Sequence, residues 1–327
     1  MKSIQEDIKN GTYKRAYLLF GEEAYLKLQY KQRLLKGLMP EEDTMNFQYF
    51  SGKGVDVKAL IDLAQTVPFF AERRVLLLED TGFFKNKCEE LADYMKELPD
   101  YLCMIFVESE VDKRSKMYKA VKNVGRAVEF AVQNEKTLAR WAAGLLGRAG
   151  RRITQKDMEL LLTRTGTDMG NISMETEKLL AYTEGRDVVT ARDIEAVCVQ
   201  QTASRIFDMV KAVAEKNQKK ALDLYKDLLT LKEPPMRILF LLAKQYYQML
   251  TAKSMEADGM AQPEIAQKLG IPSFAVRNLL SCAHAYQTCE LEEAVRDFVE
   301  AEEAVKTGCL EDILSVELLI VKYSAKA

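Results

Sequence analysis

A strand, a glycine and a helix follow one another near the start of the chain, in the arrangement that nucleotide-binding proteins use to hold phosphates. The apolar run AYLLF at residues 16–20 ends at Gly21, and residues 24–38 repeat apolar positions at helical spacing. A phosphate loop needs G-x-x-x-x-G-K-[ST], because glycines let backbone amides reach the phosphates while lysine and a hydroxyl meet the charge and the magnesium ion. Here the letters are GEEAYLKL, and Glu22 and Glu23 place carboxylates where ATP would bring negative charge. We therefore expect no nucleotide hydrolysis and no cofactor at this turn.

The cysteines and the single histidine do not form a metal-binding pattern. The six cysteines include no Cys-x-x-Cys pair, and His284 with Cys289 would supply only two ligands. We expect both residues to pack in a helical region, with no metal and no catalytic site.

Two adjacent phenylalanines stand on a predicted turn. The stretch QTVPFFAERRVLLLED at residues 65–80 sets Phe69 and Phe70 directly after Pro68, which fixes φ and stiffens the approach. Burying each ring is worth about 1.5 to 3 kcal/mol. Two rings on a turn therefore indicate either a partner that covers them or a plug that folds back under the sheet. Arg73 and Arg74 could act as rim charges that assist encounter, or could simply be solvated.

Residues 262–283 have the pattern of a helix-turn-helix, with a Gly-Ile-Pro turn between two helical segments. As a reader of the major groove, the second helix would present Ser273, Phe274, Arg277 and Asn278 to base edges. The alternative is that two bundle helices are joined by a tight turn. No basic face accompanies the motif, although phosphate contacts supply most of the affinity in such complexes.

Strands and helices alternate through the first third of the chain, and helices follow. Strand-like runs lie at AYLLF, MNFQYFSG, RRVLLLED, LCMIFVES and AVEFAV, with helical segments between them. This order predicts a parallel sheet covered on both faces. From about Asn134 the strand signals stop and amphipathic helices begin, among them helices opened by Thr154 and Thr190. The segment MRILFLLAKQYYQMLTAKSM is apolar around most of its circumference, which predicts a central helix of the last bundle.

Net charge and hydrophobicity argue against a membrane protein and against general attraction to nucleic acid. The 327 residues have a net charge of −2, which gives no general attraction toward a polyanion. No run approaches the ~18 uncharged apolar residues of a membrane span, and the start MKSIQEDIKNG has acids where a signal peptide would be apolar. We therefore expect a cytoplasmic protein without a membrane association.

Five stretches in order make the chain resemble the delta subunits of the bacterial DNA polymerase III clamp loader. They are YLLFGEEAYL at 17–26, VPFFAERRVLLLED at 67–80, DKRSKMYKAV at 112–121, METEKLLAY at 174–182 and AEEAVKTG at 301–308. The resemblance implies a fold of class α/β plus all-α in three domains. These are an AAA+-like domain without a functional P-loop (residues 1–134), a helical lid domain (135–203) and a helical collar domain for oligomerisation (204–327).

The resemblance also implies a function and a set of partners. Phe69 and Phe70, with Pro68, match a hydrophobic pair that wedges into the sliding clamp, the beta subunit, and favours an opened ring. The chain is then a non-catalytic subunit of a DNA polymerase holoenzyme, without intrinsic nucleotidyltransferase activity. It would assemble with the ATP-binding gamma/tau subunits and delta prime, meet primed-template DNA through the assembled complex, and be monomeric when isolated. The alternative function is a nucleic-acid-binding regulator that uses the helix-turn-helix at 262–283.

Overall fold

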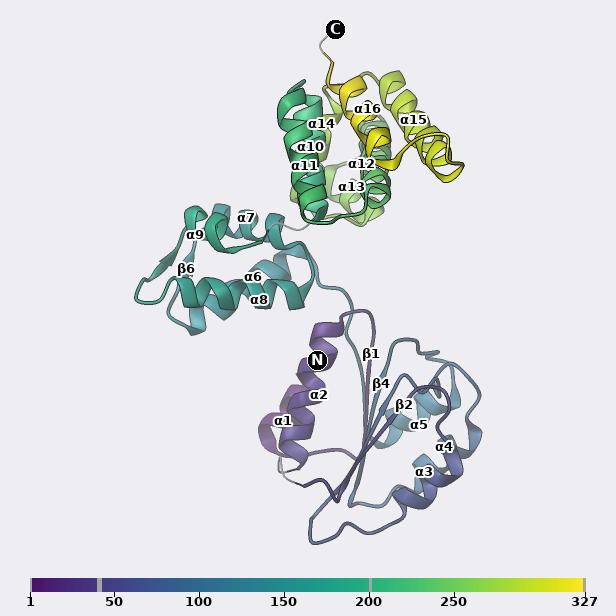
Figure 1. Cartoon of the computed structure of the whole chain (residues 1–327). Helices are drawn as coiled ribbons and strands as arrows, with labels where there is room; N and C mark the ends of the chain where they lie inside the picture. The colour runs from purple at the N-terminus through teal and green to yellow at the C-terminus, as the bar shows by residue number, and fades with distance from the viewer. Residues whose placement is uncertain (1, 40–42, 200–201, 326–327) are drawn as a thin grey trace. The chain divides into compact units, whose positions relative to one another are not determined.

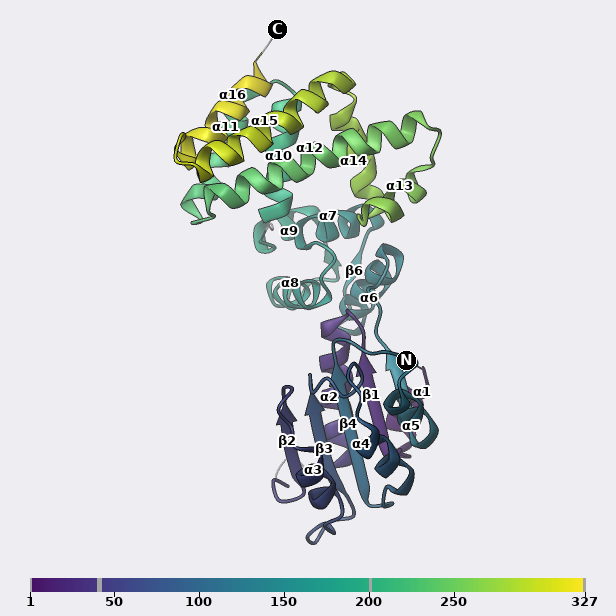
Figure 2. The same cartoon turned by 90° about the vertical axis from the view of Figure 1, so that its right-hand side faces the viewer.

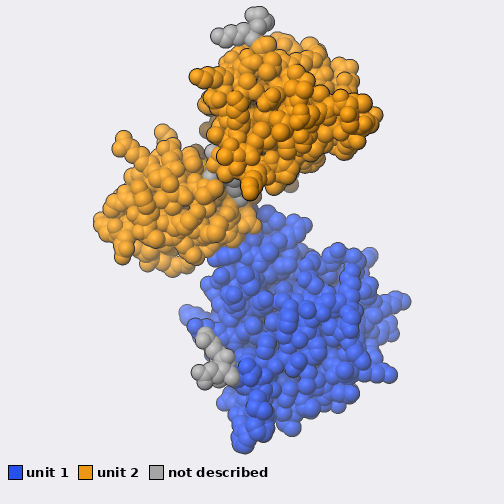
Figure 3. All heavy atoms as spheres, in the orientation of Figure 1, with its two compact units in different colours: residues 1–133 blue, residues 134–327 orange. Residues whose placement is uncertain are grey.

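The chain folds into two compact units. The computed structural model describes residues 2–39, 43–199 and 202–325. Residues 1–133 form the first unit and residues 134–327 the second (Figure 3). A further boundary near residue 203 is not part of this division, so the three-domain organisation stays a prediction. No helix within the described ranges is both long and apolar enough to cross a membrane.

The first unit is built on a parallel sheet, as the sequence predicts. Its five strands lie in the order β2-β3-β4-β1-β5, which places β1 between β4 and β5 (Figure 2). All four strand pairings are parallel. The strands are β1 Ala16–Phe20, β2 Phe47–Ser51, β3 Arg74–Glu79, β4 Leu102–Glu108 and β5 Arg126–Glu129.

Helices cover both faces of this sheet, which confirms the expected α/β class. On one face α1 and α2 pack over Tyr17, Leu19 and Ile105, and on the other α3, α4 and α5 pack over Leu18, Leu76 and neighbouring residues (Figure 1). Because successive strand residues point to opposite faces, a continuous apolar run fills both cores. The helices are α1 Lys2–Asn10, α2 Ala24–Leu38, α3 Val57–Ala64, α4 Glu89–Tyr94 with a 3₁₀ turn at Met95–Glu97, and α5 Lys116–Val124.

Helix α1 is not predicted by the sequence pattern. It buries Ile4 and Asp7 against the rest of the first unit. The Asp7 carboxylate accepts hydrogen bonds from the Tyr17 hydroxyl at 3.1 Å and from Arg126 Nε at 3.1 Å. These partners lie on β1 and at the start of β5, so the helix is fixed by residues distant in sequence.

The turn after β1 is closed by the chain that follows β5. Phe130 N donates to Phe20 O at 2.7 Å, and Glu23 N donates to Phe130 O at 2.9 Å. Gly21 between them has φ +113°, and a Cβ added there would lie 2.4 Å from Phe130 O. Only glycine fits this turn without displacing the backbone of Phe130.

The second unit is helical, with one small addition. Two-residue strands β6 (Arg152–Ile153) and β7 (Val188–Val189) pair in parallel. The expectation that strands end near Asn134 is therefore wrong, because a two-residue strand is too short to leave a periodic pattern. The helices are α6 Glu135–Arg148, α7 Gln155–Thr165, α8 Met169–Tyr182, α9 Ala191–Val197, α10 Thr202–Ala214, α11 Gln218–Thr230, α12 Pro235–Ala257, α13 Gln262–Leu269, α14 Ser273–Ala283, α15 Thr288–Lys306 and α16 Asp312–Ser324.

Helix α12 is the centre of the last bundle, as predicted. It contacts α10, α13, α14, α15 and α16. Tyr246 is buried at its middle and shares a hydrogen bond of 3.1 Å with the hydroxyl of Tyr286. Phe240 and Tyr247 of the same helix remain exposed, so part of its apolar circumference is left uncovered. The predicted N-caps are also confirmed, since Thr154 and Thr190 precede α7 and α9.

We predict that Gly21→Ala destabilises the first unit more than Gly52→Ala does. Both glycines have positive φ, which costs an alanine roughly 1 to 2 kcal/mol. A Cβ at Gly52 would meet open space, whereas one at Gly21 overlaps Phe130 and adds roughly 1 to 3 kcal/mol. Urea unfolding of both variants measures the difference. Equal losses of stability would show that Phe130 does not close the turn.

Candidate protein-binding site

The two phenylalanines lie on the loop between α3 and β3. Asp56 caps α3 by accepting hydrogen bonds from the amides of Lys58 and Ala59, and the loop begins after the helix ends at Ala64. The Phe69 side chain is 55% exposed and that of Phe70 is 95% exposed. Their rings touch edge to face, with centroids 4.5 Å apart. The structure therefore keeps the two rings together at the surface, and neither is a plug beneath the sheet.

A buried asparagine holds the backbone of this loop. Asn46, only 2% exposed, lies just before β2. Its Oδ1 accepts a hydrogen bond from Phe69 N at 2.6 Å, and its Nδ2 donates to Phe69 O at 2.9 Å. Asp43 in turn accepts from both nitrogens of Asn46, and the side-chain hydrogen bond lowers the pKa of Asp43 below its ordinary value. The loop is thus anchored by its main chain, which leaves both rings free.

Sequence reasoning misses Asn46. The residue is separated from Phe69 by 23 positions, and no periodic pattern connects the two. A single polar residue before a strand usually indicates a turn. Nothing in the sequence therefore predicts that Asn46 bonds to Phe69.

Phe70 adopts a strained backbone conformation. Its φ is +50°, in the left-handed region that costs a residue with a Cβ roughly 1 to 2 kcal/mol. Such strain persists only where the surroundings fix the backbone, and it gathers at functional sites. Here the bonds to the preceding residue supply that constraint, and the result is a ring directed into solvent.

The surface around the rings combines apolar and charged groups. Phe69 and Phe70 border a hollow of about 910 Å³ that Met45 and Arg73 also line. The Arg73 guanidinium lies 5.9 Å from the centre of the Tyr13 ring. Burial raises the pKa of the Tyr13 hydroxyl, although Arg73 opposes the shift. The hollow therefore has both apolar and charged side chains on its wall.

Arg74 turns toward the loop rather than toward solvent. Its Nη2 lies 3.4 Å from the carbonyl oxygen of Val67, to which it donates. Half-buried Pro68 follows Val67 in the same loop. Arg74 thus helps to hold the segment of the loop that precedes Phe69 and Phe70. The role of both arginines as rim charges stays a prediction.

The carboxyl end of the sheet is filled by the protein's own hydrogen bonds. Lys31 of α2 pairs with Glu79 at 2.7 Å, and the Tyr49 hydroxyl donates to the same carboxylate at 2.9 Å. Buried Glu108 accepts from the amide of Thr81 at 3.0 Å and from its hydroxyl at 2.5 Å. Burial raises the pKa of Glu108, although these hydrogen bonds favour its carboxylate form. Together with the closed turn at Gly21, these contacts occupy the edge where a doubly covered parallel sheet would bind a nucleotide.

Helices α13 and α14 have the predicted helix-turn-helix shape. Gly270 ends α13 in the left-handed conformation with φ +65°. Val276 and Leu279 face the core of the bundle, while Arg277 and Asn278 are exposed. The side chain of Phe274 lies outside the described part of the chain. Packing on α12 accounts for the shape, and a role in reading DNA stays a prediction.

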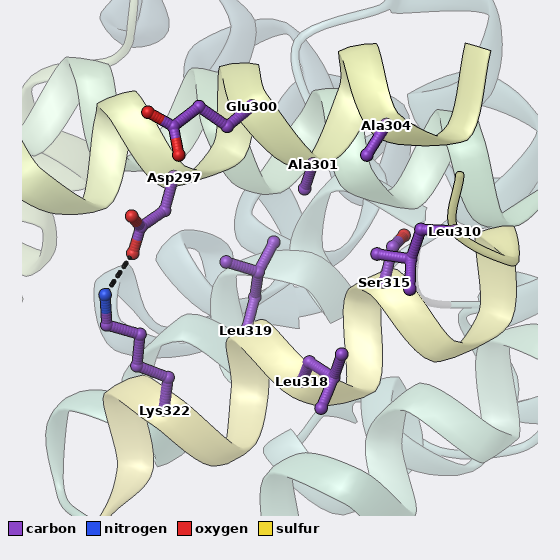
Figure 4. A pocket seen from close by; sticks show the side chains of 9 residues that line it. All are labelled: Asp297, Glu300, Ala301, Ala304, Leu310, Ser315, Leu318, Leu319 and Lys322. Carbon is purple, nitrogen blue, oxygen red and sulfur yellow. Dashed lines mark hydrogen bonds and ion pairs between the residues drawn. The ribbon is translucent and has the colours of Figure 1, made fainter. Parts of the chain in front are cut away.

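A shallow groove lies between α15 and α16 (Figure 4). Ala301, Ala304, Leu318 and Leu319 line it, and Leu318 is 52% exposed. Lys322 closes one end by pairing with Asp297 at 2.7 Å and with Glu293 at 2.8 Å, and these hydrogen bonds raise its pKa. The groove is a second apolar surface, separate from the phenylalanine loop.

His284 and Cys289 are both exposed in the helical region. The Nε2 atom of His284 lies 2.6 Å from the carboxylate of Glu256, which links α14 to α12. Within the described ranges, no three side chains of histidine, cysteine, aspartate or glutamate come close enough together to hold a metal ion.

Comparison with known proteins agrees with the fold and with the order of the segments. The family model of the DNA polymerase III delta subunit matches residues 17–131, and the model of the C-terminal domain of the same subunit matches residues 203–323. DNA polymerase III subunit delta of Bacillus subtilis is 23% identical over 98% of this chain and 95% of its own length. The probable delta subunit of Aquifex aeolicus is 21% identical over 79% of this chain and 76% of its own.

A solved structure has the same fold along the whole chain. The DNA clamp loader delta protein of Bacillus subtilis superposes with a TM-score of 0.70, at 22% identity and with 99% of both chains covered. The two family models, the two relatives and this fold agree on one assignment. The chain therefore belongs to the family of delta subunits of the DNA polymerase III clamp loader.

Proposed function

We propose that the chain binds a ring-shaped sliding clamp, the beta subunit, through Pro68, Phe69 and Phe70, and helps to open the ring for loading onto primed DNA. The observation that carries the proposal is the exposure of Phe70, at 95%, on a strained and anchored backbone. A free apolar ring is unfavourable unless a partner covers it. The hydrogen bond between Phe69 and Asn46 fixes the loop backbone before a partner binds. Less conformational entropy is then lost on binding, which supports a role as a binding loop.

Ring opening follows from differential affinity. A ligand shifts an equilibrium only by as much as it binds one state more tightly than the other. The loop therefore favours the open clamp if the site for the two rings is better formed when a clamp interface is parted. No covalent step by the chain is required for this mechanism.

We propose that the chain itself is not an enzyme and binds no ATP. The turn at Gly21 supports this, because the amide of Glu23 is hydrogen-bonded to Phe130 and Lys31 is paired with Glu79. A nucleotide would have to displace these contacts and approach Glu22 and Glu23 as well. Control by ATP then belongs to sister subunits of the gamma/tau type.

The last helical bundle, from about residue 204, is proposed to act as the collar that joins the chain to gamma/tau and delta prime. Leu314, Leu318 and Val321 follow one another at helical spacing on α16 and are exposed at 40% or more. The groove between α15 and α16 adjoins this stripe and enlarges the apolar surface. The isolated chain would be a monomer that enters the hetero-oligomer in the cytoplasm and meets primed-template DNA there.

We expect the double change Phe69→Ala and Phe70→Ala to nearly abolish clamp binding. Central aromatic anchors typically cost about 2 to 4 kcal/mol on truncation. Each ring is then worth roughly 30-fold to 1000-fold in affinity, at about 1.4 kcal/mol per decade. Surface plasmon resonance on an immobilised clamp from the same organism measures the loss, and thermal unfolding of the same variant reports its stability.

Tyr182→Ala is the matched control, because this aromatic side chain on α8 is 56% exposed and lies far along the chain from the loop. It should leave clamp affinity unchanged. Wild-type clamp affinity in the folded double variant would refute the proposed site. Binding that disappears on nuclease treatment would instead favour a nucleic-acid regulator acting through α13 and α14.

A further inference from the structure

The first part of the second unit carries a segment of unopposed positive charge. Residues 136–156 contain no aspartate or glutamate, although the whole chain has a net charge of −2. Residues 157–199 contain nine acids and four bases, so their net charge is −5. The charge is therefore separated along α6 to α9. The cations of the basic segment are Lys136, Arg140, Arg148, Arg151, Arg152 and Lys156.

These cations lack acidic partners. The ion pairs found among the described residues include none of the six. In the same region, by contrast, Lys178 pairs with Glu175 at 2.7 Å and Arg186 with Asp193 at 2.9 Å. Arg151 is partly buried and donates to the carbonyl of Ala149, whereas the side chains of the other five cations are exposed. Their charge is thus available to a ligand.

The outer face of α6 is flat as well as basic. Leu138, Ala142 and Leu146 are buried, so the opposite face of the helix presents Lys136, Arg140, Gly144 and Gly147. A Cβ added at either glycine would meet nothing within 4 Å. A glycine inside a helix lowers the stability of the helix by about 1 kcal/mol relative to alanine. Packing within this chain does not require glycine at either position, because a Cβ would contact nothing. Glycine would be required there if a partner came close to the helix backbone.

Helix-end electrostatics explain only part of the pattern. Cations stabilise the last turn of a helix, which accounts for Arg148 at the end of α6. Lys136 lies in the first turn, where the same effect is unfavourable, and Arg140 lies in the second turn, where the effect has largely fallen off. The turn after α6, with Gly150 at φ +73° and Arg151 N bonded to Leu146 O at 2.9 Å, then adds Arg151 and Arg152 at the far end.

We propose that this α6 basic face, with the turn that follows it, binds the backbone phosphates of duplex DNA without regard to sequence. From Lys136 to Arg148 the helix rises about 18 Å, a length over which a duplex carries on the order of ten phosphates on its two strands. An acidic protein surface fits less well, because protein interfaces depend on apolar or aromatic anchors. No large apolar side chain between Val132 and Met174 is strongly exposed in the described part of the chain.

The test is binding of the full chain to a short labelled DNA duplex at low salt, followed by fluorescence anisotropy. The variant R140Q/R148Q/R152Q should bind roughly ten-fold or more weakly, and the slope of log affinity against log salt should fall by about 2 to 3. The matched control K219Q/K220Q/K226Q removes the same charge from exposed lysines of α11, which are interleaved with Asp223 and Asp227. It should change the affinity less than two-fold.

Gly144→Leu provides a test in which no charge is altered. Leucine favours the helix over glycine, so the variant should fold at least as stably. Because its side chain keeps the duplex from the helix surface, DNA affinity should nevertheless fall several-fold.

Two results would overturn the proposal. One is that the triple variant and its control bind DNA equally. The other is that polyglutamate of matched charge binds the α6 basic face as tightly as DNA does, which would indicate an acidic protein as the partner. Clamp binding should be unaffected in all of these variants, so the result is independent of the phenylalanine loop.

Discussion

The two hydrogen bonds between Asn46 and the main chain of Phe69 are the constraint on which the proposed function depends. The buried Asn46 side chain pairs with the backbone amide and carbonyl groups of Phe69. The loop is therefore held in place without burying the rings of Phe69 and Phe70. Phe70 can then hold a left-handed conformation and remain exposed. An interface residue that is rigid before binding loses less entropy when it binds. The strained backbone of Phe70 thus lies in the loop that we propose to bind the clamp.

The same sheet that positions this loop has its other end closed. β3 follows the phenylalanine loop at Arg74 and ends at Glu79, which Lys31 and Tyr49 hold in place. Phe130 covers the turn at Gly21, so a site that could have served nucleotide chemistry is occupied by main-chain bonds. The proposed protein-binding loop and the closed turn at Gly21 thus lie at opposite ends of β3 and β1, and function depends on such sites and not on the fold alone.

Much of the fold could be predicted from sequence because its signals are local. Apolar runs such as AYLLF and RVLLLE predict the strands, and Thr154 and Thr190 mark helix starts. Helix α1, the short β6–β7 pair and the Asn46 anchor could not be predicted. Each depends on partners many positions away, as Asp7 does on Arg126. In the candidate site, Phe69 and Phe70 could be predicted from residue types and their order, while the strained φ of Phe70 and its anchor through Asn46 are seen only in the structure.

A double-mutant cycle between Asn46 and Phe70 tests the central claim most directly, with clamp affinity as the measured quantity. If Asn46 acts by presenting Phe70, Asn46→Ala should lower the affinity of the wild-type loop by roughly ten-fold, about 1.4 kcal/mol. In the Phe70→Ala background the same change should have a smaller effect, because only the presentation of Phe69 is then lost, and the difference between the two losses is the coupling energy. Equal losses in both backgrounds, in variants that remain folded, would contradict the account.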